Sequence, residues 1–171
     1  MEDIVVIDDF LTKDELTFTM DIINKEKWFY GNQSGETFSN IRWFGCDLSK
    51  NLFFKEYLLH KIENVTNSNW ECSRLYANGQ TPLLNGEWHI DQAPPNDTYW
   101  TALLYVSDIT RENVDIVKGY TEFKINNEIK SVEPLKNRLV IFKADISHRG
   151  LAPSIPEIFR VSLAWKLKKR R

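Results

Sequence analysis

His89 and Asp91 stand one residue apart, and His148 follows 57 positions after the aspartate (148 − 91 = 57). Two imidazoles and one carboxylate form the facial triad that holds iron(II) and leaves coordination positions open. Arg160 lies twelve positions beyond His148 (160 − 148 = 12), and its planar guanidinium can bind a carboxylate through two parallel hydrogen bonds. Together these residues predict a metal site with a place for an acidic co-substrate beside it.

The spacing of His89 and Asp91 suits an extended strand, in which side chains at i and i+2 point to the same face. Both can therefore reach one ion from a short segment, while Trp88 points away. His148 follows an apolar stretch and precedes Gly150, where the chain can turn, so it is the candidate for the third ligand. The alternative is a surface histidine beside an aspartate, which is a common arrangement, and His-x-Asp alone is weak evidence.

Arg160 and Ser162 share one face of a predicted strand over residues 159–167, because side chains alternate along a strand. A guanidinium that faces the interior needs a partner, since burying an unpaired cation is costly. A bound dicarboxylic acid would supply one, with the Ser162 hydroxyl as a second donor. Tyr76 and Tyr105 lie on predicted strands beside the metal segment and offer phenol donors. At this point a surface arginine on an edge strand and ordinary half-buried tyrosines stay open as alternatives.

Chain length and composition indicate one globular domain over residues 1–171. The net charge of −2 gives no general attraction to nucleic acid or to a membrane surface. Cys46 and Cys72 fit reduced thiols rather than a disulfide framework. Neither a signal peptide nor an apolar stretch of about 20 residues is recognisable. We therefore expect a cytoplasmic protein that does not cross a membrane, and the sequence does not define its oligomeric state.

The elements expected to position these residues change character along the chain. The segment Thr12–Glu15 has the spacing of a capping box, which predicts a helix of about four turns, and a second helical stretch covers about residues 51–65. From Trp70 onward the period is two, which is typical of strands. Asn126 and Asn127 indicate a two-residue hairpin turn, because Asn tolerates positive φ. Strands are expected at residues 4–7, 41–46, 70–77, 99–106, 120–125, 128–132, 138–143 and 159–167. This order predicts an α+β domain in which helices pack on a double sheet or barrel.

Motifs spread over about residues 4–167 resemble, in order, those of the 2-oxoglutarate- and iron(II)-dependent oxygenases, in their prolyl-4-hydroxylase-like branch. The motifs are Ile4–Leu16, Arg74–Gly79, Trp88–Asp91, Leu103–Ser107, Gly119–Phe123, Val132–Phe142 followed by His148, and Arg160–Ser162. The resemblance implies a mainly β fold, the double-stranded β-helix or jelly roll, with two N-terminal supporting helices.

The resemblance also implies the cofactors of an oxygenase and the residues that bind them. Fe(II) would be held by His89, Asp91 and His148. The co-substrate 2-oxoglutarate would chelate the iron through its keto-acid end and meet Arg160 through its distal carboxylate, and O2 would take the remaining position. The candidate hydrogen-bond donors to the co-substrate are Ser162, Tyr76 and Tyr105. Decarboxylation of 2-oxoglutarate to succinate would be coupled to hydroxylation of a substrate.

The resemblance favours a protein or peptide side chain, commonly proline, as the substrate. Trp88, Gln92 and Trp100 are the candidates for substrate contacts, with plain packing as the alternative, and loops at about 33–40 and 92–98 are among those expected to rim the site. Other functions stay open. They are oxidative demethylation of nucleic acid, which the near-neutral charge disfavours, a non-catalytic jelly-roll binding module, and a zinc hydrolase in which Arg160 would have no role.

Overall fold

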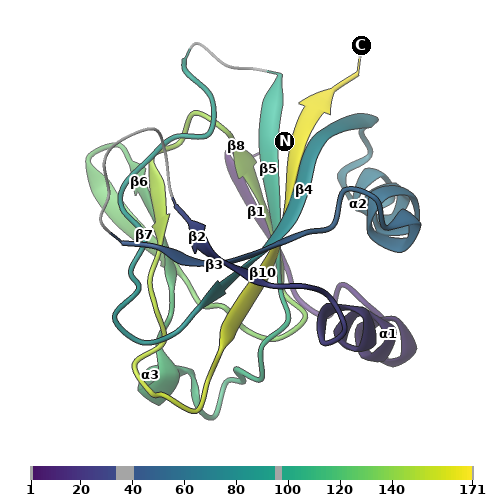
Figure 1. Cartoon of the computed structure of the whole chain (residues 1–171). Helices are drawn as coiled ribbons and strands as arrows, with labels where there is room; N and C mark the ends of the chain where they lie inside the picture. The colour runs from purple at the N-terminus through teal and green to yellow at the C-terminus, as the bar shows by residue number, and fades with distance from the viewer. Residues whose placement is uncertain (1, 34–40, 95–97, 171) are drawn as a thin grey trace.

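The computed structural model describes residues 2–33, 41–94 and 98–170. Within these ranges the strands form a seven-stranded sheet in the order β1-β8-β5-β10-β4-β3-β2 and a three-stranded sheet in the order β7-β6-β9. The neighbouring strands pair antiparallel in both sheets. Figure 1 shows the small sheet on one side of the large sheet and the two longer helical stretches on the other.

The predicted helices and strands occur in the expected order, with bounds close to the predicted ones. The large sheet consists of β1 (Ile4–Ile7), β2 (Phe29–Asn32), β3 (Trp43–Asp47), β4 (Trp70–Gln80), β5 (Tyr99–Tyr105), β8 (Leu139–Lys143) and β10 (Arg160–Lys169). The small sheet consists of β6 (Thr121–Ile125), β7 (Glu128–Val132) and β9 (His148–Gly150). The helical segments are α1 (Lys13–Ile23), the π-helical η1 (Phe53–Leu58), α2 (Leu59–Thr66) and the short α3 (Val114–Val117).

Helix α1 begins at the predicted capping box. The backbone N–H of Glu15 donates to the Thr12 hydroxyl at 3.3 Å, and the backbone N–H of Thr12 donates to the Glu15 carboxylate at 2.7 Å. Segments η1 and α2 follow each other directly and confirm the second predicted helical stretch. Their buried side chains, such as Phe54 and Leu58, pack in the core under the large sheet, where the Trp165 indole donates to the Phe54 carbonyl at 3.0 Å. The two helical stretches therefore cover one face of this sheet.

Strand β10 separates the two chemical environments of the molecule. It lies in the middle of the large sheet, between β5 and β4. Leu163 and Trp165 are fully buried in the core beneath the helices. Arg160 and Lys166 project from the opposite face, toward the small sheet, together with Ser162. The alternation is the predicted one, and it places every polar side chain of this set on the side away from the helices.

The small sheet closes over that second face. Asn126 and Asn127, at φ 51° and 65°, join β6 to β7 and confirm the predicted two-residue turn. Phe123 of β6 packs edge-to-face on Phe142 of β8, with ring centroids 4.9 Å apart. These rings and Tyr105 belong to a second, smaller core between the sheets. The sheets are thus held together at one end by apolar packing.

Sequence patterns did not predict the short elements β2, β9 and α3. Each has three or four residues, too few to show a period of its own, so their conformation depends on neighbours that are distant in the sequence. The mainly β architecture with two early helical stretches agrees with the prediction. In the described part of the chain, no helix has the length and apolar character needed to cross a membrane.

Candidate metal centre and its cavity

His89 and His148 come together because their backbones form an isolated antiparallel bridge. The His89 N–H donates to the His148 carbonyl at 3.0 Å, and the His148 N–H donates to the His89 carbonyl at 2.9 Å. A pair bonded in this way places its side chains on the same face. The two imidazole rings accordingly lie with their centroids 4.3 Å apart.

Asp91 completes the predicted triad. One donor atom from each of His89, Asp91 and His148 lies within 4.8 Å of the other two. The His89 Nε2 atom is 3.7 Å from Asp91 Oδ1, and the His148 Nε2 atom is 3.6 Å from Asp91 Oδ2. Donors bound at about 2.1 Å to one ion lie roughly 3–3.5 Å apart, so a small inward movement would bring these atoms to coordination distance.

Hydrogen bonds to the backbone set the tautomers of both histidines. The Nδ1 atom of His89 lies 2.9 Å from the Glu87 carbonyl, and that of His148 lies 2.9 Å from the Ile146 carbonyl. A carbonyl can only accept, so in each ring Nδ1 carries the proton and Nε2 keeps its lone pair. Burial lowers the pKa of His148 to about 4, against the opposing effect of Asp91, so this ring is neutral at pH 7. Both rings therefore present a free Nε2 to the same point.

The Asp91 carboxylate is held by two neighbours on its outer oxygen. Oδ2 accepts a hydrogen bond from the Thr101 hydroxyl at 2.6 Å and forms an ion pair with the Lys166 ammonium. Burial alone would raise the pKa of Asp91, but Lys166 and His148 outweigh it and lower the pKa to about 2. The carboxylate is therefore ionised at neutral pH. Two imidazoles and an ionised carboxylate in these states fit a divalent ion such as iron(II).

Arg160 is only 2% exposed, and three groups orient its guanidinium. Its Nε donates to the Gly119 carbonyl at 2.6 Å, one terminal nitrogen to Gln80 Oε1 at 2.8 Å, and the other to the Thr121 hydroxyl at 3.0 Å. Gly119 has φ 79°, and a Cβ there would lie 3.0 Å from the Arg160 side chain, so only glycine fits this approach. Among the described residues no carboxylate pairs with this buried cation.

The three predicted hydrogen-bond donors, Ser162, Tyr105 and Tyr76, lie in different parts of the cavity wall. Ser162 and Tyr105 are cross-strand partners and are both buried. The Tyr105 hydroxyl donates to Thr121 at 2.7 Å, so it supports the group that receives Arg160. Tyr76 lies four positions before Gln80 on β4 and packs instead beside Lys166, whose ammonium is 5.9 Å from the centre of its ring. Tyr76 thus belongs to the wall near Asp91.

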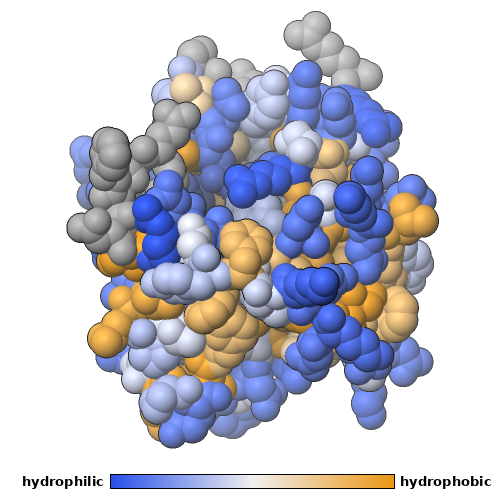
Figure 2. All heavy atoms as spheres, in the orientation of Figure 1, coloured by the Kyte–Doolittle hydropathy of each residue, from blue (hydrophilic) through white to orange (hydrophobic). Residues whose placement is uncertain are grey.

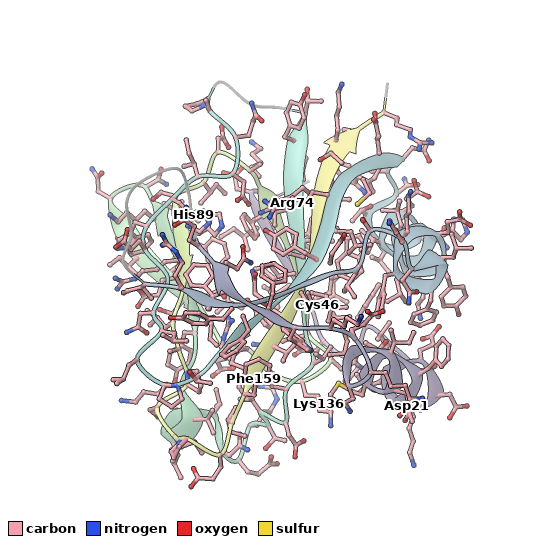
Figure 3. All side chains as sticks on the ribbon, viewed as in Figure 1. Asp21, Cys46, Arg74, His89, Lys136 and Phe159 are labelled. Atoms are coloured by element: carbon pink, nitrogen blue, oxygen red, sulfur yellow. The ribbon has the colours of Figure 1, made fainter. Side chains whose placement is uncertain are left out.

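One cavity of about 830 Å3 joins the triad to Arg160. The predicted substrate contacts Trp88, Gln92 and Trp100 all line it. Trp100 is 6% exposed and also packs on Trp70, so its main part lies in the core. Figure 3 shows Arg74 on the β4 side of this region and His89 on the side of the small sheet. The expected rim residues 34–40 and 95–97 lie outside the described parts of the chain.

Sequence reasoning gave no role to several residues that hold the site. Thr101 and Lys166 fix Asp91, while Gln80 and Thr121 fix Arg160. The alternation of side chains along the strands could have indicated two of them. Thr101 shares a face of its strand with Tyr105, and Lys166 shares a face with Arg160. What the pattern lacked was the pairing of strands, which decides which polar groups meet.

No family model and no curated protein sequence matches the chain. Solved structures do match its fold. An oxidoreductase of the 2OG-Fe(II) oxygenase family from Burkholderia pseudomallei superposes with a TM-score of 0.75 at 9% identity, covering 97% of this chain and 85% of that one. A prolyl hydroxylase from Trichoplax adhaerens, in complex with a hypoxia inducible factor peptide fragment, gives 0.71 at 13% identity over 97% and 84%. HygX from Streptomyces hygroscopicus, with nickel, 2-oxoglutarate and hygromycin B bound, gives 0.69 at 12% identity over 97% and 82%. The chain therefore has the fold of 2-oxoglutarate-dependent oxygenases.

Proposed function

We propose that the protein is an iron(II)-, 2-oxoglutarate- and O2-dependent hydroxylase, built as a single double-stranded β-helix domain, that acts on a protein or peptide side chain such as proline. One observation carries the proposal. Arg160 is a buried cation with no carboxylate partner among the described residues, and it shares a cavity with the cluster of His89, Asp91 and His148. A dicarboxylate would fit both parts of that cavity, because one end could pair with the Arg160 guanidinium while the other end ligates the metal.

His89, Asp91 and His148 would hold the iron through the two Nε2 atoms and the Oδ1 atom. When bound with 2-oxoglutarate and O2, the iron supplies the oxidising chemistry that places a hydroxyl on a C–H bond. The chain's own contribution is to keep the ligands in one protonation state and one orientation. The backbone carbonyls that accept from Nδ1 and the donors on Asp91 Oδ2 do this before the metal arrives.

Arg160 would bind the distal carboxylate of 2-oxoglutarate. A guanidinium has five N–H donors, and three are used by Gly119, Gln80 and Thr121, which leaves two (5 − 3 = 2) for a bidentate carboxylate. The fixed partners keep the guanidinium plane in place, so its rotation costs little when the anion binds. Ser162, on the same face of β10, is positioned as a further donor, and Tyr105 acts through Thr121.

The proposal is tested by binding and by turnover. Under anaerobic conditions, we expect Mn(II) or Fe(II) to bind and to be required for 2-oxoglutarate binding, measured by calorimetry. On addition of O2, we expect the Fe(II) form to release succinate slowly without a substrate and faster with a substrate peptide, whose hydroxylated product mass spectrometry identifies by a gain of one oxygen. A protein that binds the metal but shows no metal-dependent affinity for 2-oxoglutarate would contradict the proposal.

The choice of a peptide substrate follows from likeness to structures in the same fold class. A prolyl hydroxylase of this fold is in complex with a peptide fragment, and the cavity here is lined by Trp88 and by the exposed residues Ile90 and Gln92 beside it. A screen of proline-containing peptides against an amino-acid and an oligonucleotide panel, read by succinate release, tests this part separately. Faster succinate release with alkylated DNA than with any peptide would replace the substrate class and leave the reaction type unchanged.

A further inference from the structure

Two cations stand directly opposite each other on the cavity wall. Arg74 of β4 is the cross-strand partner of Lys166 of β10, so both side chains project from the same face. Both residues line the cavity that contains the metal triad. Like charges in directly opposite positions destabilise a sheet. Their pairing next to a cavity is therefore a feature that an anionic ligand would relieve.

An aromatic ring lies beneath both charges. The Arg74 guanidinium is 4.4 Å and the Lys166 ammonium 5.9 Å from the centre of the Tyr76 ring. A cation over an aromatic ring is attracted by the ring face, so the contact holds the Arg74 guanidinium beside Tyr76. Tyr76 thus serves as a support for the two cations, rather than as a contact to Arg160.

The two cations differ in how far they are neutralised. Lys166 forms an ion pair with Asp91. Arg74 forms no ion pair with a carboxylate in the parts of the chain that the structure describes, and its side chain is exposed. Asp47 is influenced by Arg74, but the pKa of its carboxyl is lowered mainly by hydrogen bonds from Ser49. Arg74 is therefore the cation with free binding capacity.

The net charge of the cavity lining also favours an anionic ligand. Among the described lining residues, the cations are Arg74, Arg160 and Lys166, and the single carboxylate is Asp91. Their sum is +2 (3 − 1 = 2), and a divalent ion together with the 2-oxoglutarate dianion adds no further net charge. The whole chain carries −2, so the positive charge is a local property of this cavity. A ligand that enters it gains from negative charge.

A second aromatic ring that lines the cavity, that of Trp88, also has two cations over it. Lys124 and Arg149 lie over the Trp88 ring at 4.3 Å and 4.6 Å from its centre. Arg149 is paired with Glu122 at 2.7 Å, whereas Lys124 has no ion pair with a described carboxylate. Figure 2 shows hydrophilic and apolar side chains intermixed on this face of the molecule. Two of the aromatic rings that line the cavity, Tyr76 and Trp88, therefore each have two cations over them.

We infer that Arg74 determines substrate specificity and that the substrate is an acidic peptide, with an Asp or Glu side chain within two residues of the hydroxylated residue. The inference rests on the proposed function and names its substrate class. Arg74 and Lys166 are adjacent across the strands, with Cβ atoms about 5 Å apart, and Lys166 touches the metal ligand Asp91. Arg74 and the triad line the same cavity, so the carboxylate that Arg74 holds belongs to a residue near the hydroxylated one, and an extended chain advances roughly 3.3 Å per residue.

The test uses the full chain loaded with Mn(II) and 2-oxoglutarate, without O2. A library of peptides with a central proline and randomised flanks is selected on the immobilised complex, and the bound fraction is sequenced by mass spectrometry. Asp and Glu should be enriched within two positions of the proline. A selected Glu peptide should bind roughly tenfold tighter than its Gln isostere, the difference expected for a charge-assisted hydrogen bond, and sodium chloride should narrow the gap.

Arg74→Gln should remove the preference for Glu over Gln, and Arg74→Lys should keep part of it. Arg111→Gln, at an exposed arginine paired with Asp8, is the matched control and should keep it fully. Equal affinity for the Glu and Gln peptides in the parent protein overturns the inference, as does a single-stranded oligonucleotide that binds tighter than the peptide. Affinity for 2-oxoglutarate is measured on the same samples. If it is normal while the acidic preference is missing, only this inference fails, and if it is absent, the proposed function fails too.

Discussion

The Lys166 ammonium pairs with Asp91 on the carboxylate oxygen that also accepts from Thr101. This contact assigns separate roles to the two oxygens of one side chain. Oδ2 is held by Lys166 and Thr101 and lies 3.6 Å from His148 Nε2, whereas Oδ1 has, among the described residues, only His89 Nε2 near it, at 3.7 Å. In the proposed function, Asp91 would therefore ligate the metal through Oδ1, which would leave room for a chelating co-substrate.

Replacing Arg160 with alanine should weaken 2-oxoglutarate binding and spare the metal. Loss of one partner of a buried charge pair costs about 2–5 kcal/mol, which corresponds to roughly 30- to 4,000-fold in affinity. Calorimetric titration of 2-oxoglutarate into the Mn(II) protein measures the first quantity, and manganese titration alone measures the second. Arg111→Ala serves as the control. Unchanged 2-oxoglutarate affinity in Arg160→Ala would remove Arg160 from the site.

Two threonine-to-valine changes of equal size should separate the two halves of the cavity. Thr101→Val removes the neutral donor to Asp91 and should lower metal affinity roughly 10- to 100-fold. Thr121→Val removes the acceptor of Arg160 and Tyr105 and should weaken 2-oxoglutarate binding by about 1–2 kcal/mol, roughly 5- to 30-fold. Manganese and 2-oxoglutarate titrations of both variants give the comparison. Identical effects of the two variants would contradict the separate roles.

Asp91→Ala should abolish metal-dependent succinate release, because it removes the carboxylate ligand. Manganese binding, followed by electron paramagnetic resonance, should fall in parallel while the circular dichroism spectrum stays that of the parent. Asp115→Ala, at an exposed aspartate of α3, is the control. Full succinate release in the Asp91 variant would show that the metal is held elsewhere.

Stability in acid should depend on Glu15. Burial alone would raise its pKa, but bonds from Lys61 and Tyr57 lower the pKa to about 2 from an ordinary value of 4.5. The carboxylate therefore stabilises the fold fully above about pH 4.5, and this contribution is lost as the pH falls toward 2.

Glu15→Gln should lower the melting temperature at pH 7 by roughly 1–4 °C. The deficit relative to the parent should shrink as the pH falls from about 4.5 to 2. Thermal unfolding across that range measures both, with Glu56→Gln, an exposed glutamate of η1, as the control. A constant deficit at every pH would show that the charge of Glu15 is not involved.

Asn137 should be a sensitive position for stability. Its side chain accepts from the Leu11 N–H and donates to the Leu11 carbonyl, both at 2.8 Å, and its φ is 66°. Asn137→Ala leaves buried backbone groups without partners and keeps a Cβ in a left-handed conformation, so we expect a loss of roughly 2–4 kcal/mol in the free energy of unfolding. Asn137→Gly relieves only the second cost and should fall between the alanine variant and the parent in chemical denaturation. Equal stability of the two variants would mean that backbone strain contributes nothing.

The sequence alone determined which residue types are candidate metal ligands and predicted most of the local elements that carry them. The spacing of His89 and Asp91, the capping box at Thr12, and the turn at Asn126 each act over a few residues, so a one-dimensional pattern was enough to predict them. The alternation along β10 likewise separated Arg160 from Trp165 without any knowledge of their surroundings.

Only the tertiary structure decided which distant groups meet. The bridge between His89 and His148, the partners of Arg160 and the alignment of Arg74 with Lys166 all depend on strand pairing across long stretches of chain. A shift of register by one residue would turn each of these side chains to the other face. Register is set by how the cores pack as a whole, which is why candidate ligands could be proposed from the sequence, whereas the residues that surround them could not.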